Sequence, residues 1–365
     1  MKPVGIGFIG CGNISPAYLK AAKGFPILDI VALADANPAA AEARAGEFGL
    51  EARSIEALLA DPKIEIVVNL TVPKAHVEVG LRAIAAGKHV HSEKPLGITV
   101  AEARKLIAAA EARGVRVGCA PDTFLGGAHQ TARKLIDEGA IGRPIGGTAF
   151  FLCPGHESWH PNPGFYYLHG GGPMLDMGPY YITDLVNLLG PVARVSGMAT
   201  RLRGERSITS EPLKGTRIPV EVATHVTGAL EFVGGAVVTI TMSFDVPQHK
   251  HAPIEIYGET ASLLVPDPNF FGGQIEIAGP REDWRPVATE HAYADGNYRS
   301  IGIADMAHAI RSNRPHRASG ALAFHVLEVM EAFQRSSDSG AFVTIETRPE
   351  RPAMLPVGLK TGELD

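Results

Sequence analysis

Residues 4–15 read Val-Gly-Ile-Gly-Phe-Ile-Gly-Cys-Gly-Asn-Ile-Ser, an apolar run that leads directly into a glycine-rich turn. This order predicts a buried strand, a tight turn and the start of a helix. Gly10 permits the turn, and Gly12 has no Cβ, so a pyrophosphate can approach the backbone there. The helix that begins near Asn13 and Ile14 points its first N–H groups at that anion. The stretch therefore predicts a dinucleotide-binding Rossmann domain.

An acidic residue, Asp35, ends the next apolar run, which spans residues 27–34. Its carboxylate can accept hydrogen bonds from both hydroxyls of the adenosine ribose, and it would repel a 2′-phosphate. NAD is therefore favoured over NADP as the cofactor. Ser15 stands where the usual fingerprint has a third glycine, so an ordinary strand-to-helix turn is the alternative interpretation.

The bulk composition is that of a globular protein with two domains. The chain has 365 residues and a formal net charge of -5, which argues against a general nucleic-acid binder. No apolar stretch approaches the length of a membrane span, and the N-terminus does not read as a signal peptide. The three cysteines show no metal-ligand spacing, so no metal site and a cytoplasmic location are expected. Small molecules are the expected partners.

The first third of the chain alternates short apolar runs with helical patterns. This rhythm predicts a doubly wound parallel sheet that helices cover on both faces. The expected strands are residues 4–9, 27–34, 64–70, a short one around Val90, and 115–119, and the expected helices after the first are 38–48, 75–86 and 100–113.

The pattern changes near Pro121, where we place the boundary between an NAD-binding domain, residues 1–121, and a second domain, residues 122–365. After a helix at 128–138, several longer runs alternate apolar and polar residues, which predicts an α+β domain with a large, mainly antiparallel open sheet. Its expected strands are 146–152, 194–202, 222–232, 236–244, 254–257 and 262–265, and two late helices, 298–312 and 321–336, are expected to cover the sheet.

Further motifs lie at the predicted ligand-binding edge and in the second domain. They are Thr71-Val72-Pro73 followed by His76, Gly87-Lys88-His89-Val90 before Glu93-Lys94-Pro95, Gly142-Arg143-Pro144, and Gly170-Gly171-Gly172 ahead of Asp176. With the glycine turn, these motifs resemble the Gfo/Idh/MocA family, named for glucose-fructose oxidoreductase and inositol dehydrogenase, over essentially the whole chain.

The resemblance implies a nucleotide-binding domain followed by a domain whose open sheet shapes the substrate pocket and forms contacts between subunits. It implies oxidation or reduction of a carbon of a sugar or cyclitol, and a homo-oligomer, either a dimer or a tetramer. The cofactor contacts that we expect beyond the glycine turn and Asp35 come from Thr71, Pro73, His76, Glu93, Lys94 and Pro95.

Lys94 is the expected source of positive charge beside the reacting hydroxyl. Oxidation of a secondary alcohol requires a hydride acceptor, a base for the hydroxyl proton and stabilisation of the developing alkoxide. The resemblance places Lys94 next to the nicotinamide. Glu93 has two interpretations, a structural ion pair or a direct contact with the cofactor.

Asp176 and Tyr180 are the other expected catalytic residues, and here the sequence departs from the family. Many relatives have a histidine four residues after the aspartate, where this chain has Tyr180. A neighbouring ammonium such as Lys94 would favour the phenolate, so Tyr180 can serve as a base. Alternatively, Tyr180 only packs, and the proton passes through Lys94, Asp176, a pocket histidine or water. Asp176 has a second interpretation as a helix cap.

Residues 155–167 are rich in aromatic and imidazole side chains and predict a pocket loop. Trp159 offers a flat face to a sugar ring, while His160 and Tyr166 can hydrogen-bond hydroxyls. His156 and His160 are spaced as metal ligands would be on a helix, but the prolines and glycine around them argue against that helix. Asp122, which follows the last strand of the first sheet, is also expected to reach the substrate.

These observations predict an NAD-dependent dehydrogenase of a sugar, glycoside or cyclitol. Two alternatives remain from the sequence. One is an enzyme that cleaves glycosides with no net redox change, through transient oxidation by a tightly bound NAD. The other is a non-catalytic NAD-binding sugar sensor, which retention of Lys94 and Asp176 disfavours.

Overall fold

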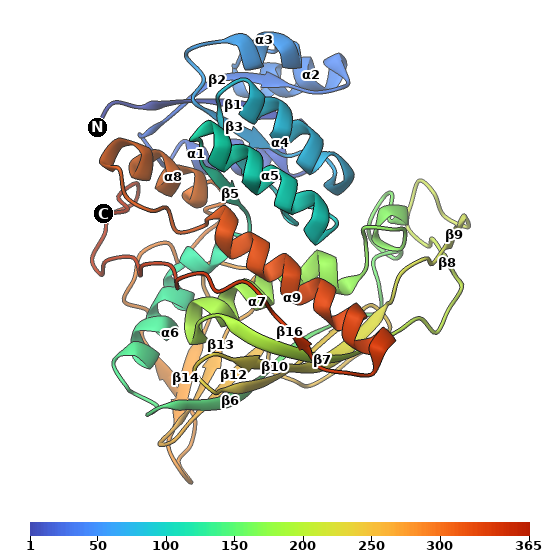
Figure 1. Cartoon of the computed structure of the whole chain (residues 1–365), viewed down its shortest axis with the longest axis vertical. Coiled ribbons are helices and arrows are strands. Elements are labelled where there is room, and N and C mark those ends of the chain that lie inside the picture. The colour runs from blue at the N-terminus through green and yellow to red at the C-terminus, as the bar shows by residue number, and fades with distance from the viewer.

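The computed structural model describes residues 1–365, and its N-terminal part is a parallel five-stranded sheet in the order β2-β1-β3-β4-β5 (Figure 1). The order reverses between β1 and β3, so the carboxyl ends of these two strands flank the ligand crevice of an open α/β sheet. The strands are β1 Val4–Ile9, β2 Leu28–Ala34, β3 Ile66–Asn69, β4 His89–Ser92 and β5 Val117–Cys119. The predicted Rossmann sheet is confirmed.

The helices between these strands have the start and stop signals that the sequence contains. The Asn37 side chain caps α2 and the Thr99 side chain caps α5, and Gly49 and Gly114 end these helices in the left-handed conformation. The structure adds a short helix, α3, that the sequence pattern did not predict. The helical segments are α1 Ser15–Ala22, α2 Pro38–Phe48, α3 Ile55–Ala60, η1 Pro73–Ala75, α4 His76–Ala85 and α5 Val100–Arg113.

The second sheet has nine strands in the order β15-β14-β13-β12-β6-β11-β10-β7-β16. Only β6 and β11 pair in parallel, so the expectation of a mainly antiparallel sheet is confirmed. Its strands are β6 Pro144–Leu152, β7 Val192–Thr200, β10 His225–Phe232, β11 Val237–Ser243, β12 Ile254–Gly258, β13 Ser262–Val265, β14 Ile275–Ala278, β15 Arg285–Val287 and β16 Val343–Thr344. Two further strands, β8 Glu205–Ser207 and β9 Arg217–Pro219, form a separate hairpin.

One face of the large sheet is covered by helices, and the other face is open (Figure 1). Along β11, Val238, Ile240 and Met242 are buried toward the helices, whereas Val237 and Thr239 are exposed on the opposite face. The covering helices are α6 Gly127–Asp137, α7 Pro173–Leu189 and α9 Gly320–Ser339, and short 3₁₀ turns, η2 Thr123–Leu125 and η3 Gly164–Tyr166, precede α6 and α7. None of the helices combines the length and apolar character that a membrane span requires.

The helix α8, Ile301–Ser312, does not cover the large sheet as predicted. It returns to the first domain and packs beside α1 and β5 (Figure 1). Arg311 near its end bonds the carbonyls of Lys2 and Pro3 and forms an ion pair with Glu65. The chain therefore crosses between the two sheets again after residue 122, which local periodicity does not reveal.

His91 on β4 is fully buried, and neither of its ring nitrogens has a hydrogen-bond partner. Burial lowers the pKa of His91 to about 3, so its imidazole stays neutral in the folded protein. In the unfolded chain the same imidazole takes up a proton near pH 6.5. The unfolded state then binds more protons, and stability falls as the pH drops from 6.5 toward 3. By this linkage, His91 lowers the free energy of unfolding by about 2 kcal/mol at pH 5 relative to pH 7.

We expect His91→Leu to remove this part of the acid sensitivity. Urea unfolding at pH 7 and pH 5 should show a smaller loss of stability in the variant than in the parent protein. His249→Leu, at a position that lies exposed after β11, supplies the control for the substitution of histidine by leucine. An equal loss of stability in His91→Leu and the parent would contradict the prediction.

Candidate active site

Lys94 lies just beyond the carboxyl end of β4, at the edge where an open parallel sheet binds its ligands. Glu93, the residue before it, accepts a hydrogen bond from the Tyr18 hydroxyl at 2.6 Å and another from the backbone N–H of Lys94 at 2.9 Å. Neither oxygen of the Glu93 carboxylate is paired with a cationic side chain. The structure therefore does not support the first interpretation of Glu93, a structural ion pair. Glu93 holds the loop that carries Lys94 against α1.

The Lys94 ammonium is paired with Asp176 in the first turn of α7. Its Nζ lies 2.8 Å from Asp176 Oδ1 and 2.8 Å from the Asp176 carbonyl oxygen. The other carboxylate oxygen lies 3.3 Å from Nε2 of His156. Asp176 does not cap the helix, because Gly172 is at the cap position and the Asp176 carboxylate faces Lys94. The structure thus joins the two domains through this ion pair.

The pair is fixed in its charged state. Burial opposes the ionisation of Asp176, but Lys94 and the hydrogen bond from His156 outweigh it and lower the pKa of Asp176 to about 2. Burial also opposes the charge on Lys94, yet Asp176, Tyr180 and Glu93 raise the pKa of Lys94 above its ordinary value. Lys94 is therefore a hydrogen-bond donor near neutral pH, with two of its three N–H groups directed at Asp176.

Tyr180 lies one turn after Asp176, with the Lys94 ammonium 5.3 Å from the centre of its ring. Lys94 does favour the phenolate, as expected, and so does the neighbouring Arg299 guanidinium. Burial is the larger effect, however, and the pKa of Tyr180 is raised above its ordinary value. Tyr180 is only 7% exposed, so of its two interpretations this balance favours a neutral phenol over a phenolate.

The pocket loop 155–167 forms an aromatic cluster around His156. The His156 ring centre lies 4.2 Å from that of Tyr166 and 5.2 Å from that of Trp159. Trp159 also meets His160 edge-on at 5.3 Å and is 60% exposed, so one side of the indole is free. Tyr166 is half-buried and lies within electrostatic reach of Asp176 and Lys94. The loop therefore borders the ion pair with aromatic and imidazole groups.

Two residues that we expected to bind ligands are buried and form hydrogen bonds within the protein. Asp122 is buried, and its Oδ2 accepts hydrogen bonds from Ser300 N at 3.2 Å and Gly302 N at 3.0 Å, at the start of α8. These bonds anchor the start of α8 on Asp122, and its contact with substrate stays a prediction. His76 is buried with its two ring nitrogens 2.7 Å from Pro95 O and 2.9 Å from Thr71 O.

His76 thereby ties together the loops that carry the other expected cofactor contacts. Thr71 is held by the Asn69 side chain, whose oxygen accepts from the Thr71 hydroxyl at 2.7 Å. Pro73 starts η1 directly after this loop. These loops follow β3 and β4, so Thr71, Pro73 and Pro95 lie at the same sheet edge as Lys94.

The glycine turn has the shape that a dinucleotide needs. Gly10 has a φ of +107°, and a Cβ there would meet the backbone of Leu70 at 2.5 Å. A Cβ on Gly12 would meet nothing within 4 Å, so open space lies where a pyrophosphate would approach. Asn13 and Ile14 lead into α1, and no side chain caps that helix, so its N-terminal N–H groups can bind an anion.

Asp35 supports this turn at the end of β2. Its carboxylate accepts hydrogen bonds from Cys11 N at 2.7 Å and from Asn37 N at 2.8 Å. A cavity of about 430 Å³ opens beside it, between α2 and residues 52–56. The turn, the open helix end and this acidic residue together fit the pyrophosphate and ribose of NAD.

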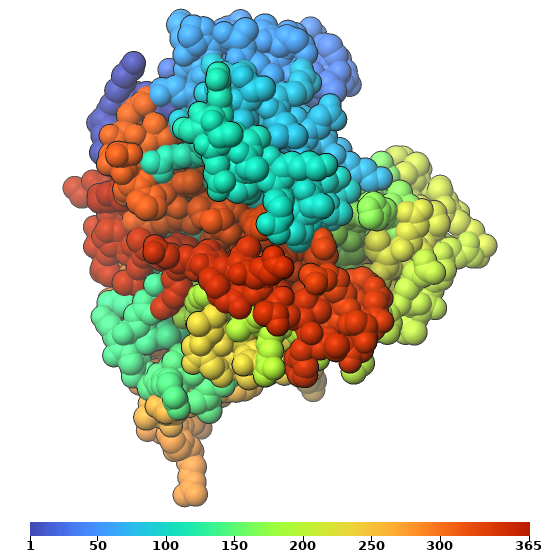
Figure 2. Space-filling model, in the orientation of Figure 1, coloured from blue at the N-terminus to red at the C-terminus, as the bar shows by residue number.

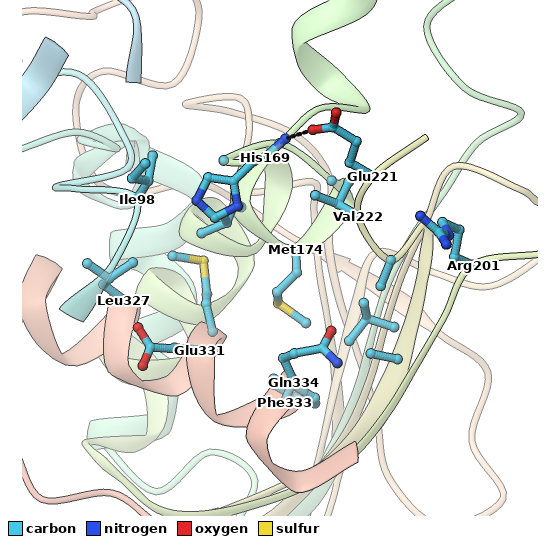
Figure 3. A pocket seen from close by; sticks show the side chains of 18 residues that line it. Ile98, His169, Met174, Arg201, Glu221, Val222, Leu327, Glu331, Phe333 and Gln334 are labelled. Carbon is cyan, nitrogen blue, oxygen red and sulfur yellow. Dashed lines mark hydrogen bonds between the residues drawn. The ribbon is translucent and has the colours of Figure 1, made fainter. Parts of the chain in front are cut away.

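A cavity in the second domain, shown in Figure 3, is lined by Met174 and Leu175 of α7 but by neither member of the ion pair. Its volume is about 460 Å³, and it is bounded by the glycine loop 170–172, the start of α7, α9 and the large sheet. Met174, Leu327 and Phe333 line it, with His169 and Glu221 at its edge. No group of three or more histidine, cysteine, aspartate or glutamate side chains in the structure is arranged to hold a metal ion.

Sequence reasoning missed two residues that the fold brings to the site. From the sequence, His156 was considered only as a metal ligand. Its contact with Asp176 joins two residues that are 20 positions apart, so no local pattern reveals it. In the sequence, Arg299 lies between β15 and α8, and its guanidinium lies close to the Tyr180 phenol. No local pattern in the sequence indicates Arg299. For His156 there was a signal, because position 180 lacks the histidine that many relatives have, and another imidazole could have been sought near Asp176.

Comparison with known proteins places the chain in a family. Residues 4–120 match the model of the oxidoreductase family with an NAD-binding Rossmann fold, and residues 129–264 match the GFO/IDH/MocA C-terminal domain. The 1,5-anhydro-D-fructose reductase of Ensifer adhaerens is 34% identical over 179 residues, which are 47% of this chain and 52% of that protein. This alignment thus spans about half the length of the reductase.

Levoglucosan dehydrogenase of Pseudarthrobacter phenanthrenivorans is 25% identical over 328 residues, 81% of this chain and 83% of that protein. A solved structure of levoglucosan dehydrogenase in complex with NADH and levoglucosan has the same fold, with a TM-score of 0.81, 24% identity, and coverage of 94% of this chain and all of that one. The two family matches together cover most of the chain, including the whole first sheet and the larger part of the second. The chain belongs to the Gfo/Idh/MocA oxidoreductase family.

Proposed function

We propose that this protein is an NAD-dependent dehydrogenase that oxidises a hydroxyl carbon of a sugar, glycoside or cyclitol, or reduces the corresponding ketone. The observation that carries the proposal is the Lys94–Asp176 ion pair at the ligand edge of the Rossmann sheet. The names of the relatives support the substrate class, since they include a reductase of an anhydro sugar, a levoglucosan dehydrogenase and an inositol 2-dehydrogenase.

The first domain would hold the cofactor, which accepts or donates the hydride when it is bound. The backbone at Gly10, Gly12, Asn13 and Ile14 would bind the pyrophosphate, and Asp35 would bind the adenosine ribose. At the nicotinamide end, the proposed contacts are Thr71, Pro73, Glu93, Lys94 and Pro95, with His76 acting through the backbone of its neighbours.

In this proposal Lys94 donates its third N–H to the oxygen of the reacting carbon, and in the oxidation the hydroxyl proton passes to a pocket histidine or to water as the hydride leaves the carbon. The ammonium is held in place by the carbonyl and the carboxylate of Asp176, so it needs no rearrangement when negative charge develops on that oxygen. Tyr180 borders the same space as a neutral phenol. Trp159, His160 and Tyr166 would contact the rest of the substrate, with Trp159 against the C–H face of a sugar ring.

We also propose that residues 1–121 bind the cofactor and residues 122–365 bind the substrate, and that the protein is a cytoplasmic homo-oligomer. The open face of the large sheet supports the proposal of an oligomer. This face carries apolar side chains that are unusually exposed for strand positions, with Met198 at 70% and Val237 at 48%. A second copy of the sheet would cover them.

The test is NADH formation by the purified protein with NAD, or with NADP in parallel, on monosaccharides, inositols, disaccharides and anhydro sugars. We expect NADH from at least one of these compounds and a preference for NAD, because Asp35 repels the 2′-phosphate. Cleavage of a glycoside without release of NADH would favour the redox-neutral alternative. Tight binding of NAD with neither reaction would favour the sugar sensor.

A further inference from the structure

The segment 201–224 leaves the large sheet as an arm that contains the β8–β9 hairpin and projects from the body of the molecule (Figures 1 and 2). Most of this arm is exposed, with Leu202 80% exposed. A few residues of the arm are buried, namely Arg206, Ile208, Ser210, Val220 and Thr224. The side chain of Arg206 on β8 is only 1% exposed, and it points into the body of the molecule.

Arg206 binds the base of the pocket loop. Its Nη1 donates to Glu157 Oε1 at 2.6 Å and to Pro154 O at 2.9 Å, and its Nη2 donates to Phe244 O at 2.7 Å and also pairs with Asp245. A guanidinium with several N–H donors in a fixed plane can satisfy such a set of acceptors at once. A buried cation with this many partners fixes the position of the loop that it contacts.

A continuous chain of hydrogen bonds leads from Arg206 to Lys94. Glu157 accepts from Arg206 and from the Tyr167 hydroxyl, and that hydroxyl oxygen accepts from the backbone N–H of His156 at 3.1 Å. The His156 ring then contacts Asp176 Oδ2 at 3.3 Å, and Asp176 Oδ1 contacts Lys94 at 2.8 Å. Each link is a polar contact between groups that are largely buried.

The arm holds the loop at a second point, through its backbone and a hydroxyl. Thr209 N and Ser210 N both donate to the Glu157 carbonyl, at 2.8 and 3.1 Å, and the Ser210 hydroxyl donates to the His160 carbonyl at 2.6 Å. The arm thus contacts both ends of the segment from His156 to His160.

We propose that Arg206 is a positioning residue for the reaction: through Glu157, Tyr167 and His156, it sets the orientation of Asp176 and hence of Lys94. The inference rests on the proposed function, because it takes the Lys94–Asp176 pair as the reacting site. Misplacement of a reacting group by about 1 Å can cost about 10²-fold in rate, so a remote positioning residue can have a large effect.

The test compares Arg206→Gln with Arg217→Gln in the full-length protein. Arg217 lies on the same hairpin, but its side chain is 70% exposed and its partner is the exposed Glu205. We expect hydrogen exchange of residues 154–167 to become about 10-fold faster in Arg206→Gln and to stay unchanged in Arg217→Gln. Exchange in β1 and β3 and the affinity for NADH should stay at the parent values in both variants.

On a substrate found in the panel, Arg206→Gln should lower kcat/KM about 10-fold or more. Guanidinium ion should restore part of the activity of Arg206→Ala, whereas urea, which is similar in shape but uncharged, should not. Ser210→Ala, which removes one hydroxyl and is not expected to prevent folding, should accelerate exchange in the same peptide to a smaller extent.

Equal exchange in Arg206→Gln and Arg217→Gln would overturn the proposal. So would faster exchange throughout the protein, because Arg206 would then only stabilise the fold, and so would faster exchange of the loop with no loss of kcat/KM. If the parent protein oxidises none of the compounds, the proposed function fails, and the exchange measurements still decide whether Arg206 positions His156.

Discussion

Replacement of Lys94 by methionine is expected to lower kcat for NADH formation about 10³-fold, in line with the loss of a donor that stabilises a developing oxyanion. Methionine keeps the length and most of the volume of the lysine stem but supplies no N–H. The alkoxide oxygen would then lose the group that faces it, and the Asp176 carboxylate would be left with His156 alone. Steady-state kinetics on the best substrate of the panel measure this loss.

Thermal unfolding and NADH binding of Lys94→Met should be measured alongside. The affinity for NADH should fall far less than kcat, because most of the proposed cofactor contacts do not involve Lys94, whereas the thermal midpoint should fall because the buried Asp176 carboxylate loses its charged partner. Tyr180→Phe is the matched control at the same site. Since the phenol is neutral and has a raised pKa, we expect only partial loss, about 10-fold, in that variant. Similar activities of Lys94→Met and Tyr180→Phe would contradict the role given to Lys94.

The first domain could be predicted almost completely from the sequence because its signals are local. The glycine turn, the capping side chain Asn37 and the glycines that end α2 and α5 each act within a few residues of their own position. The short helix α3 was missed because it has only six residues, too few for a periodic pattern.

The second domain was harder because its important features depend on distant contacts. The helix α7 begins with Pro173, a regular start signal, but Gly178 and Pro179 inside it suggest a break. Tertiary packing overrides that local preference, since most of α7 is buried between the large sheet and α9. The packing of α8 on the first domain likewise depends on residues about 300 positions apart, such as Arg311 and Pro3.

The candidate site shows the same division. Lys94 and Asp176 were predicted from short motifs, and they are in contact in the structure. For Tyr180 the sequence left a base and a packing residue open, because it shows which charges are near but not how deeply a side chain is buried. Asp122 was placed at the correct sheet edge, but its carboxylate faces α8, an element that comes 180 residues later.

The two glycines of the turn should respond to the same substitution in different ways. Gly12→Ala adds a Cβ that meets no protein atom within 4 Å, so we expect the thermal midpoint to stay unchanged. If the pyrophosphate lies against this glycine, the added methyl group occupies its space, and the affinity for NADH should fall about 10²-fold or more, equivalent to about 2.7 kcal/mol. Titration of the NADH fluorescence, or calorimetry, measures this affinity.

Gly10→Ala should instead damage the fold itself. Its Cβ would lie 2.5 Å from the carbonyl carbon of Leu70, a backbone atom that cannot move aside, and its φ of +107° disfavours any side chain. We expect a loss of roughly 3 kcal/mol or more in stability, together with the loss of NADH binding. The pair of variants separates the two roles of the turn, because only Gly12→Ala removes cofactor affinity from a protein that is still folded. Parent-like NADH affinity in Gly12→Ala would show that the pyrophosphate does not lie at this turn, and the assignment of Asn13, Ile14 and the start of α1 to the cofactor would fail with it.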